Sequence, residues 1–254
     1  FGGVQLLMIG DLFQLPPIVR DHEWHIMKDY YRSAFFFDSL ALQQSGSVYL
    51  ELEKIFRQDD ETFIALLNNL RNNSTTRADI ELLNQHYKPE NDRKGLEGVI
   101  TLTTHNRTAD TMNQQALKDL KGKSFYYSAE IDKDFPESMF PVDQTLELKI
   151  GAQVMFIKND TQDGKYFNGK IAKVVKLDEE RVTVEFEDTK EDFVLRKETW
   201  ENRKYTIDQE TKELEEEVIG SFNQFPLKLA WAITVHKSQG LTFDKAIIDV
   251  GRAF

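Results

Sequence analysis

The sequence predicts an α/β protein that carries an all-β insert. Residues 4–9 (VQLLMI) and 245–250 (KAIIDV) are largely apolar runs of the kind found in buried strands of parallel sheets. Strand, turn and helix patterns follow one another near residue 100, as is typical of an α/β layer. From about residue 145 the pattern changes to short alternating strands separated by turn residues, which favours a separate β structure.

The first half of the chain supplies the expected α/β elements. Residues 63, 64, 66, 67 and 70 are apolar at helical spacing, with Asp59 or Asp60 as the capping residue. The loop 10–17 follows the first apolar run directly and therefore lies at the carboxyl end of a predicted strand. We expect strands at residues 4–9, 35–38, 48–52 and 99–102, and helices at residues 60–72, at 77–86 and after residue 105.

The second half predicts the insert. Asp163-Gly164 and Asn168-Gly169 are turn sequences between short alternating strands, and this pattern favours a small barrel of SH3 type. The acidic stretch 208–217 is interpreted as the solvated face of a hairpin. We expect strands at residues 153–157, 171–177, 181–186 and 192–195, with the α/β pattern returning at residues 227–235.

Composition excludes several classes of protein. The 254 residues include 32 basic and 43 acidic side chains, a net charge of −11, which excludes a polycation that coats nucleic acid by bulk charge. A locally basic groove is still compatible with this balance. The chain has no cysteine, which excludes disulfides, a cysteine nucleophile and thiolate metal sites. No apolar run is long enough for a membrane span, and no secretory signal is visible.

The two ends lead us to expect a fragment of a longer protein. The chain begins with FGG rather than Met, and its last ten residues read as a buried strand followed by a turn. Natural termini tend to be polar and mobile.

The loop GDLFQLPP at residues 10–17 is the first candidate site. Loops at the carboxyl ends of parallel strands are where α/β folds place ligands. Asp11 could reach a metal-bound water, and the amide of Gln14 could orient a phosphate or a water. The alternative is an ordinary exit from a strand into a turn.

Two further segments carry polar groups suited to phosphate. In LEKIFRQ at residues 52–58, Arg57 could direct a planar guanidinium at a phosphate; alternatively it is an ordinary surface arginine. In TVHKSQG at residues 234–240, hydroxyl, imidazole and backbone N–H groups gather at a helix start, which suits phosphate contacts. For His236 alone, a hydrogen-bonded structural role is the alternative.

Together these segments resemble superfamily 1B DNA helicases of the RecD and Pif type. GDLFQLPP is similar to motif III, FRQ to motif IV and TVHKSQGLT to motif V. Two weaker similarities are LTTHN at residues 102–106, with Asn113, and GAQVMFIKN at residues 151–159, with Asn168-Gly169. The motifs run in order from III to V, and the resemblance covers nearly the whole chain.

The resemblance implies a RecA-like parallel-sheet motor domain with an inserted SH3-like barrel. Residues 1–45 would be the carboxyl-terminal remnant of the first RecA-like domain. Residues 46–157 and 226–254 would form the second RecA-like domain, and residues 158–225 the insert.

The resemblance also implies site residues. Gln14 and Arg57 would be catalytic, Gln14 by sensing the γ-phosphate and Arg57 by reaching it from the second domain. The implied nucleotide-binding set is Gly10, Asp11, Gln14, Arg57, Gln239 and Gly240. The implied DNA-binding set is Thr103, His105, Asn106, Thr234, His236, Lys237 and Ser238, and no metal ligand is implied within the chain.

No phosphate-loop sequence G-x-x-x-x-G-K-[ST] occurs in the chain. Gly122-Lys123-Ser124 imitates its end, but Leu117 stands where the first glycine is required. We therefore expect ATP and Mg²⁺ to bind the full-length protein and the fragment alone to be inactive.

The resemblance implies an ATP-dependent DNA helicase that moves along single-stranded DNA from 5′ to 3′, a monomer in the cytoplasm or nucleus, acting in DNA repair and recombination. A protein partner could bind the insert, and no membrane contact is expected. Two alternatives remain: a non-catalytic binding module derived from a helicase, and the helicase subunit of a RecD-like nuclease complex.

Overall fold

A computed structural model describes residues 4–44, 46, 48–56, 58–88, 98–186, 188–207, 214–243, 245–249 and 251. The chain divides into two compact units, Phe1–Lys94 and Gly95–Phe254, and each is described by itself. Among the residues so described, no helix is long and apolar enough to cross a membrane.

The regular elements described in the first unit are all helical. Asp60 begins α3 because its carboxylate accepts hydrogen bonds from the backbone N–H groups of Thr62 and Phe63. Thr76 and Asp79 begin α4 with a reciprocal capping box. The helices predicted at residues 60–72 and 77–86 are therefore confirmed. The unit contains α1 (Asp21–Met27), η1 (Phe36–Asp38), α2 (Leu40–Gln44), α3 (Glu61–Arg71) and α4 (Arg77–Gln85).

Three strand predictions in this unit are wrong. Residues 4–9 and 48–52 have no regular structure and no paired neighbour among the described residues, and Leu7 and Leu50 are 79% and 81% exposed. A strand requires a hydrogen-bonded neighbour, and no described segment of the chain pairs with these two. Residues 36–38 form a 3₁₀ turn instead, beside which the rings of Phe35 and Phe37 stack at a centroid distance of 5.3 Å.

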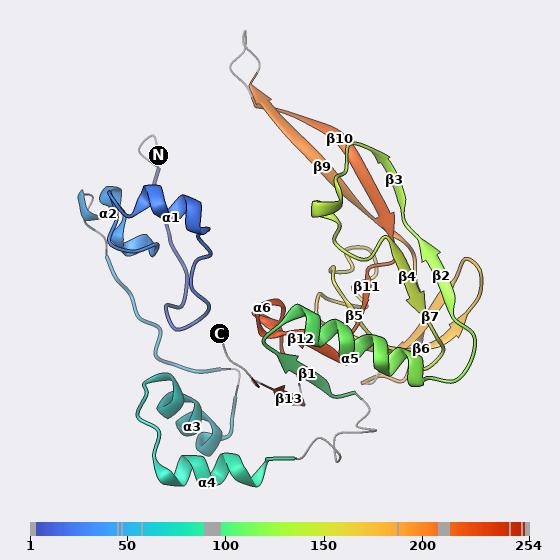
Figure 1. Ribbon diagram of the computed structural model, residues 1–254, viewed down its shortest axis with the longest axis horizontal. Helices are drawn as coiled ribbons and strands as arrows, with labels where there is room; N and C mark the ends of the chain where they lie inside the picture. Colours follow the sequence, from blue (N-terminus) through green and yellow to red (C-terminus); the bar gives the residue numbers. More distant parts are fainter. Residues whose placement is uncertain are drawn as a thin grey trace. The chain divides into compact units, whose positions relative to one another are not determined.

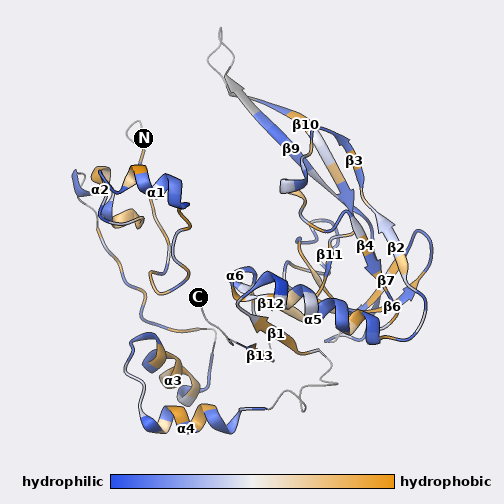
Figure 2. Cartoon of the chain, in the orientation of Figure 1, coloured by the Kyte–Doolittle hydropathy of each residue, from blue (hydrophilic) through white to orange (hydrophobic). Residues whose placement is uncertain are grey.

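A parallel sheet organises the second unit. Its strands β1 (Ile100–Thr103), β12 (Ala232–Thr234) and β13 (Ala246–Asp249) lie in the order β12-β1-β13, so β1 is central. Figure 2 shows β1 in the colour of hydrophobic residues, as expected for a strand between two neighbours. The helices α5 (Asn106–Asp119) and α6 (Val235–Ser238) directly follow β1 and β12. The predicted mixed α/β structure with a parallel sheet is confirmed.

A five-stranded antiparallel sheet contains the main core. Val154, Val174 and Val184 are fully buried within it. Its edges are β11 and β8, so the described sheet is open, and a closed SH3-like barrel is not confirmed. In the order β11-β5-β6-β7-β8, the strands are Leu227–Leu229, Gln153–Phe156, Ile171–Leu177, Val182–Phe186 and Asp192–Val194.

Two smaller antiparallel sheets complete the unit. One pairs β2 (Phe125–Ser128) with β4 (Thr145–Leu148), so the Gly122-Lys123-Ser124 sequence is followed by a strand and not by a phosphate-loop helix. The other has the order β3-β10-β9, with η3 (Glu137–Met139) following β3 in the chain. Its strands are β3 (Glu130–Lys133), β10 (Leu214–Gln224) and β9 (Glu198–Ile207), and Figure 1 shows β9 and β10 as a long hairpin.

The β9–β10 hairpin has a close backbone contact at its base. The pairing of β10 with β9 is irregular between Val218 and Gly220, where a β-bulge occurs. A Cβ atom on Gly220 would lie 2.2 Å from the carbonyl oxygen of Asp134. Only glycine therefore allows β10 to approach this backbone so closely.

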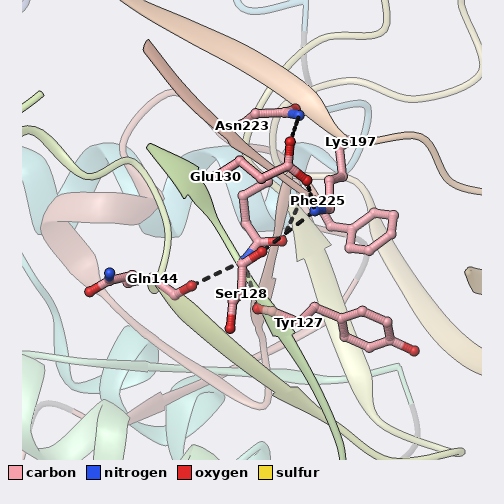
Figure 3. A network of polar contacts seen from close by, with 8 residues as sticks. Tyr127, Ser128, Glu130, Gln144, Lys197, Asn223 and Phe225 are labelled. Carbon is pink, nitrogen blue, oxygen red and sulfur yellow. Dashed lines mark hydrogen bonds and ion pairs between the residues drawn. The ribbon is translucent and has the colours of Figure 1, made fainter. Parts of the chain in front are cut away.

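Buried and exposed polar groups join the small sheets (Figure 3). The side chain of Gln224 is fully buried; its Nε2 donates to the carbonyl oxygen of Tyr127 at 2.8 Å, and its Oε1 accepts from the N–H of Phe225 at 2.9 Å. At the surface, Glu130 accepts from Lys197 Nζ at 2.7 Å. Burial, followed by the charge of Asp178, raises the pKa of Tyr127 to about 12.

Candidate functional site

The loop 10–17 folds around the carboxylate of Asp11. The Oδ1 atom of Asp11 accepts from the N–H of Phe13 at 3.0 Å, and its Oδ2 atom faces Gln14 Nε2 at 3.4 Å. The N–H of Gln14 donates to the Asp11 carbonyl oxygen at 3.2 Å, which closes a turn. The structure therefore brings the two predicted nucleotide-binding residues Asp11 and Gln14 into contact.

Arg71, at the end of α3, completes this arrangement. Its two terminal nitrogens donate to the two carboxylate oxygens of Asp11 at 3.1 and 2.9 Å, and its guanidinium lies 4.7 Å from the centre of the Phe13 ring. The hydrogen bond from Phe13, followed by the contacts with Gln14 and Arg71, lowers the pKa of Asp11 below its ordinary value, although burial opposes the change. The charged carboxylate of Asp11 thus stabilises the conformation of the loop, and both of its oxygens already accept hydrogen bonds.

The structure gives fewer contacts for two other predicted nucleotide-site residues, Gly10 and Arg57. Gly10 is exposed, and a Cβ built there would meet open space. Arg57 lies outside the described residues, so its meeting with Gln14 stays a prediction.

The second candidate site lies at one edge of the parallel sheet. Thr103 on β1 is in register with Thr234 on β12 and with Asp249 on β13. Because the three strands are parallel, their carboxyl ends meet at this edge, where α/β folds place ligands. The structure therefore brings the segment 103–106 beside the segment 234–238, as a shared site for the predicted DNA-binding residues requires.

Burial divides these residues into two groups. The side chains of Thr103 and Thr234 are buried, each 3% exposed, so they support the turns from inside. The exposed members that can meet a ligand are His105, Asn106, His236 and Lys237. Ser238 is half-buried, and its hydroxyl donates to the carbonyl oxygen of Val235 at 2.8 Å.

Asn113 fixes α5 against β12. Its Nδ2 donates to the carbonyl oxygen of Ala232 at 2.8 Å, and its Oδ1 accepts from the N–H of Ala232 at 2.9 Å. Asn113 is buried, so this reciprocal pair fixes the middle of α5 against the start of β12. The residues 105 and 106 at the start of α5 are thereby held near α6.

The segment after α6 packs on the antiparallel sheet. Gly240 has a positive φ of 80°, which turns the chain within the predicted motif V. Leu241 then contacts the turn at Gly169, where a Cβ would lie 2.6 Å from Leu241 Cδ2. Gln239 and Gly240 are both exposed beside this contact.

Sequence reasoning missed two charged residues close to this site. Lys228 on β11 is half-buried, and burial, followed by the nearby charge of Lys237, lowers its pKa. Asp249 ends β13 at the same sheet edge as Thr103. A single lysine in LKL and a single aspartate in AIID carry no signal in the sequence, because only folding places them near the motif residues.

The donor set offers no metal centre within the described part of the chain, where no group of three or more His, Asp or Glu side chains could hold a metal ion.

No protein-family model matches the chain, but comparison with individual proteins finds clear similarities. The chain is 33% identical over 267 aligned residues to the human ATP-dependent DNA helicase PIF1, covering all of this chain and 38% of that protein. It is 40% identical to Bacteroides sp. Pif1 in complex with ADP-AlF4, with a TM-score of 0.83, covering all of this chain and 57% of that one.

A third comparison is with Bacteroides Pif1 bound to single-stranded DNA, at 40% identity and a TM-score of 0.69, with all of this chain and 57% of that chain covered. The chain thus spans between about two fifths and three fifths of the length of these proteins. Along its whole length, the chain is homologous to the PIF1 family of superfamily 1B ATP-dependent DNA helicases.

Proposed function

We propose that this chain is the portion of an ATP-dependent DNA helicase that couples a nucleotide site to movement along single-stranded DNA, from 5′ to 3′. The human relative is named as an ATP-dependent DNA helicase, and the similar Bacteroides structures contain ADP-AlF4 or single-stranded DNA. The observation that carries the proposal is the register of Thr103 with Thr234, which gathers the two polar segments at one sheet edge.

The loop 10–17 and Arg57 form the nucleotide side of this proposal, with Gly10, Gln239 and Gly240 as further contacts. Gln14, whose amide contacts Asp11, would orient a γ-phosphate or a water, and Arg57 would stabilise negative charge on the phosphate. ATP, bound with Mg²⁺ in the complete protein, would supply the phosphoryl group whose hydrolysis drives movement.

The carboxylate of Asp11 fits a structural role in this site better than a metal-binding role, because Arg71 already occupies both of its oxygens. In this proposal the ligands of Mg²⁺ therefore come from residues other than Asp11. Loop 10–17 contributes the Gln14 amide and its backbone.

The edge of the parallel sheet forms the DNA side. Lys237, His236, His105 and Asn106 are exposed there and can donate to phosphate or sugar oxygens. Thr103 and Thr234 hold the two turns from beneath, and Ser238 stabilises the turn of α6. Such contacts are weak and renewable, which suits translocation and is compatible with the net charge of −11.

We further propose the domain organisation that the family suggests. Residues 1–45 would belong to the first RecA-like domain, residues 46–157 and 226–254 to the second, and residues 158–225 to an SH3-like insert. The open antiparallel sheet supports a β insert. Two of its strands, β5 and β11, lie outside residues 158–225, one before the proposed insert and one after it. The insert would offer the surface for a protein partner of a monomeric helicase in the cytoplasm or nucleus.

The proposal is tested with Lys237→Ala in the complete protein that contains this chain. We expect weaker binding to single-stranded DNA and a salt dependence, plotted as log K against log salt, that is shallower by about 0.7 for one lost phosphate contact. Lys176→Ala is the matched control, since Lys176 is an exposed lysine paired with Asp192 on the antiparallel sheet. Equal salt slopes for Lys237→Ala and the wild type would contradict the DNA-binding role.

The catalytic part of the proposal has its own test. Arg57→Ala in the complete protein should greatly reduce ATP hydrolysis stimulated by single-stranded DNA, because charge on the phosphate is left without its partner. An unchanged hydrolysis rate would favour the non-catalytic binding module instead.

A further inference from the structure

The Arg71–Asp11 pair is the feature of the first unit that the proposed function does not yet use. It joins residues that are 60 positions apart in the chain, one in loop 10–17 and the other in the last turn of α3. The sequence did not single out Arg71, which there is simply an arginine at the end of a predicted helix.

The geometry of the pair is specific to arginine. Two parallel N–H···O hydrogen bonds of 3.1 and 2.9 Å engage both oxygens of one carboxylate, and the guanidinium also lies against the Phe13 ring. A planar fork matches a carboxylate in this way, whereas a lysine offers a single charged point. Arg71 therefore fixes the orientation of the Asp11 carboxylate as well as its charge.

The Asp11 carboxylate in turn holds Gln14. Its Oδ2 receives both Arg71 and the Gln14 amide nitrogen, while its Oδ1 receives Arg71 and the Phe13 N–H. If the carboxylate rotates, its contact with the Gln14 amide nitrogen is lost and the amide can change its orientation. The position of the proposed γ-phosphate sensor is thus set by a side chain on α3.

From this geometry, and resting on the proposed function, we propose that Arg71 is a positioning residue for ATP hydrolysis: it locks Asp11 and, through Asp11, the Gln14 amide. Loop 10–17 and α3 lie in the same compact unit, Phe1–Lys94. With the proposed boundary at residue 45 they would belong to different motor domains, and the pair would then link the sensor loop to the second one.

The test uses the complete protein with Arg71→Ala, Arg71→Lys and a control, Arg77→Ala. Arg77 is an exposed arginine on α4 whose ion pair with Glu81 lies within one helix. We expect Arg71→Ala to lower kcat for DNA-stimulated ATP hydrolysis on the order of tenfold, with KM for ATP changed less than twofold. Arg71→Lys should recover only part of kcat, and Arg77→Ala should behave as the wild type.

A second measurement separates positioning from activity. Hydrogen exchange of the Phe13 and Gln14 amides should become faster in Arg71→Ala and not in Arg77→Ala. If exchange is unchanged, or if kcat is unchanged while exchange rises, the positioning role is refuted. A wild-type protein without DNA-stimulated hydrolysis would instead refute the proposed function, because the failure then appears before any substitution.

Discussion

The amide of Asn113 takes the place of a neighbouring strand on the open side of β12. It donates to and accepts from the backbone of Ala232, which lies in an edge strand of the described parallel sheet. Because both backbone groups are buried with Asn113, they have no water to replace a lost partner. A single side chain therefore sets the spacing between α5 and β12.

We predict that Asn113→Ala lowers the free energy of unfolding of the chain by about 2–4 kcal/mol, because a buried N–H and a buried C=O each lose a hydrogen bond. Urea denaturation measures this loss. The adjacent exposed residue supplies the control, Gln114→Ala, which should change the free energy of unfolding by less than about 0.5 kcal/mol. Equal midpoints for both variants would show that the reciprocal pair contributes nothing to stability.

The residue types in the motifs did not reveal which side chains are buried and which are exposed. The cluster from Thr234 to Ser238 was singled out by its polar groups and by its similarity to motif V, but Thr234 is buried and serves as support, whereas Lys237 is exposed. Arg71 and Lys228 could not be found, because their importance comes from partners 60 and 9 positions away that only the fold brings close.

The turn at Gly169 is where the antiparallel sheet contacts the segment that follows α6. Gly169 adopts a φ of +99°, and Leu241 occupies the space where its Cβ would lie. Gly164 shares the positive φ, at 64°, but a Cβ there would meet open space. The two glycines therefore separate the cost of backbone strain from the cost of displacing Leu241.

We predict that Gly164→Ala costs about 1 kcal/mol of stability through backbone strain alone, and that Gly169→Ala costs about 1–3 kcal/mol more because Leu241 must move. Methyl NMR should show a shift of the Leu241 signals in Gly169→Ala only. If both variants lose the same stability and leave the Leu241 methyl signals in place, the packing contact has no energetic role.

Local patterns predicted the helices and long-range pairing decided the strands. The helices α3 and α4 follow from apolar spacing and from capping at Asp60 and Thr76. Residues 4–9 have an equally clear apolar pattern but form no strand, because no described segment pairs with them. The insert was predicted as β structure from its turns, whereas the openness of its sheet depends on which strands pair.

The buried core is unequally divided between the two units. Leu66 is the one buried hydrophobic side chain among the described residues of the first unit, whereas extensive clusters fill the second. Burial of apolar surface is the main source of folding free energy. The two units of the 254-residue chain should therefore differ in stability.

We predict that amide hydrogens of α3 and α4 exchange at least tenfold faster than those of β5, β6 and β7 in the 254-residue chain. The physical reason is that local opening costs little where few apolar contacts are lost. Hydrogen exchange measured by mass spectrometry distinguishes the units, with α5 as an internal reference helix from the second unit. Equal protection of α3 and α5 would mean that both units unfold together.

The close approach at Gly220 fixes the position of the long hairpin at its base. The strands β9 and β10 pair along ten residues of β9 and rest at Asp134 on a contact too tight for any side chain. Next to this contact lies the buried cluster of Phe135, Val142 and Phe222. Because Phe222 of this cluster lies on β10, a displacement of the outer part of the hairpin would be transmitted to the aromatic packing at its base.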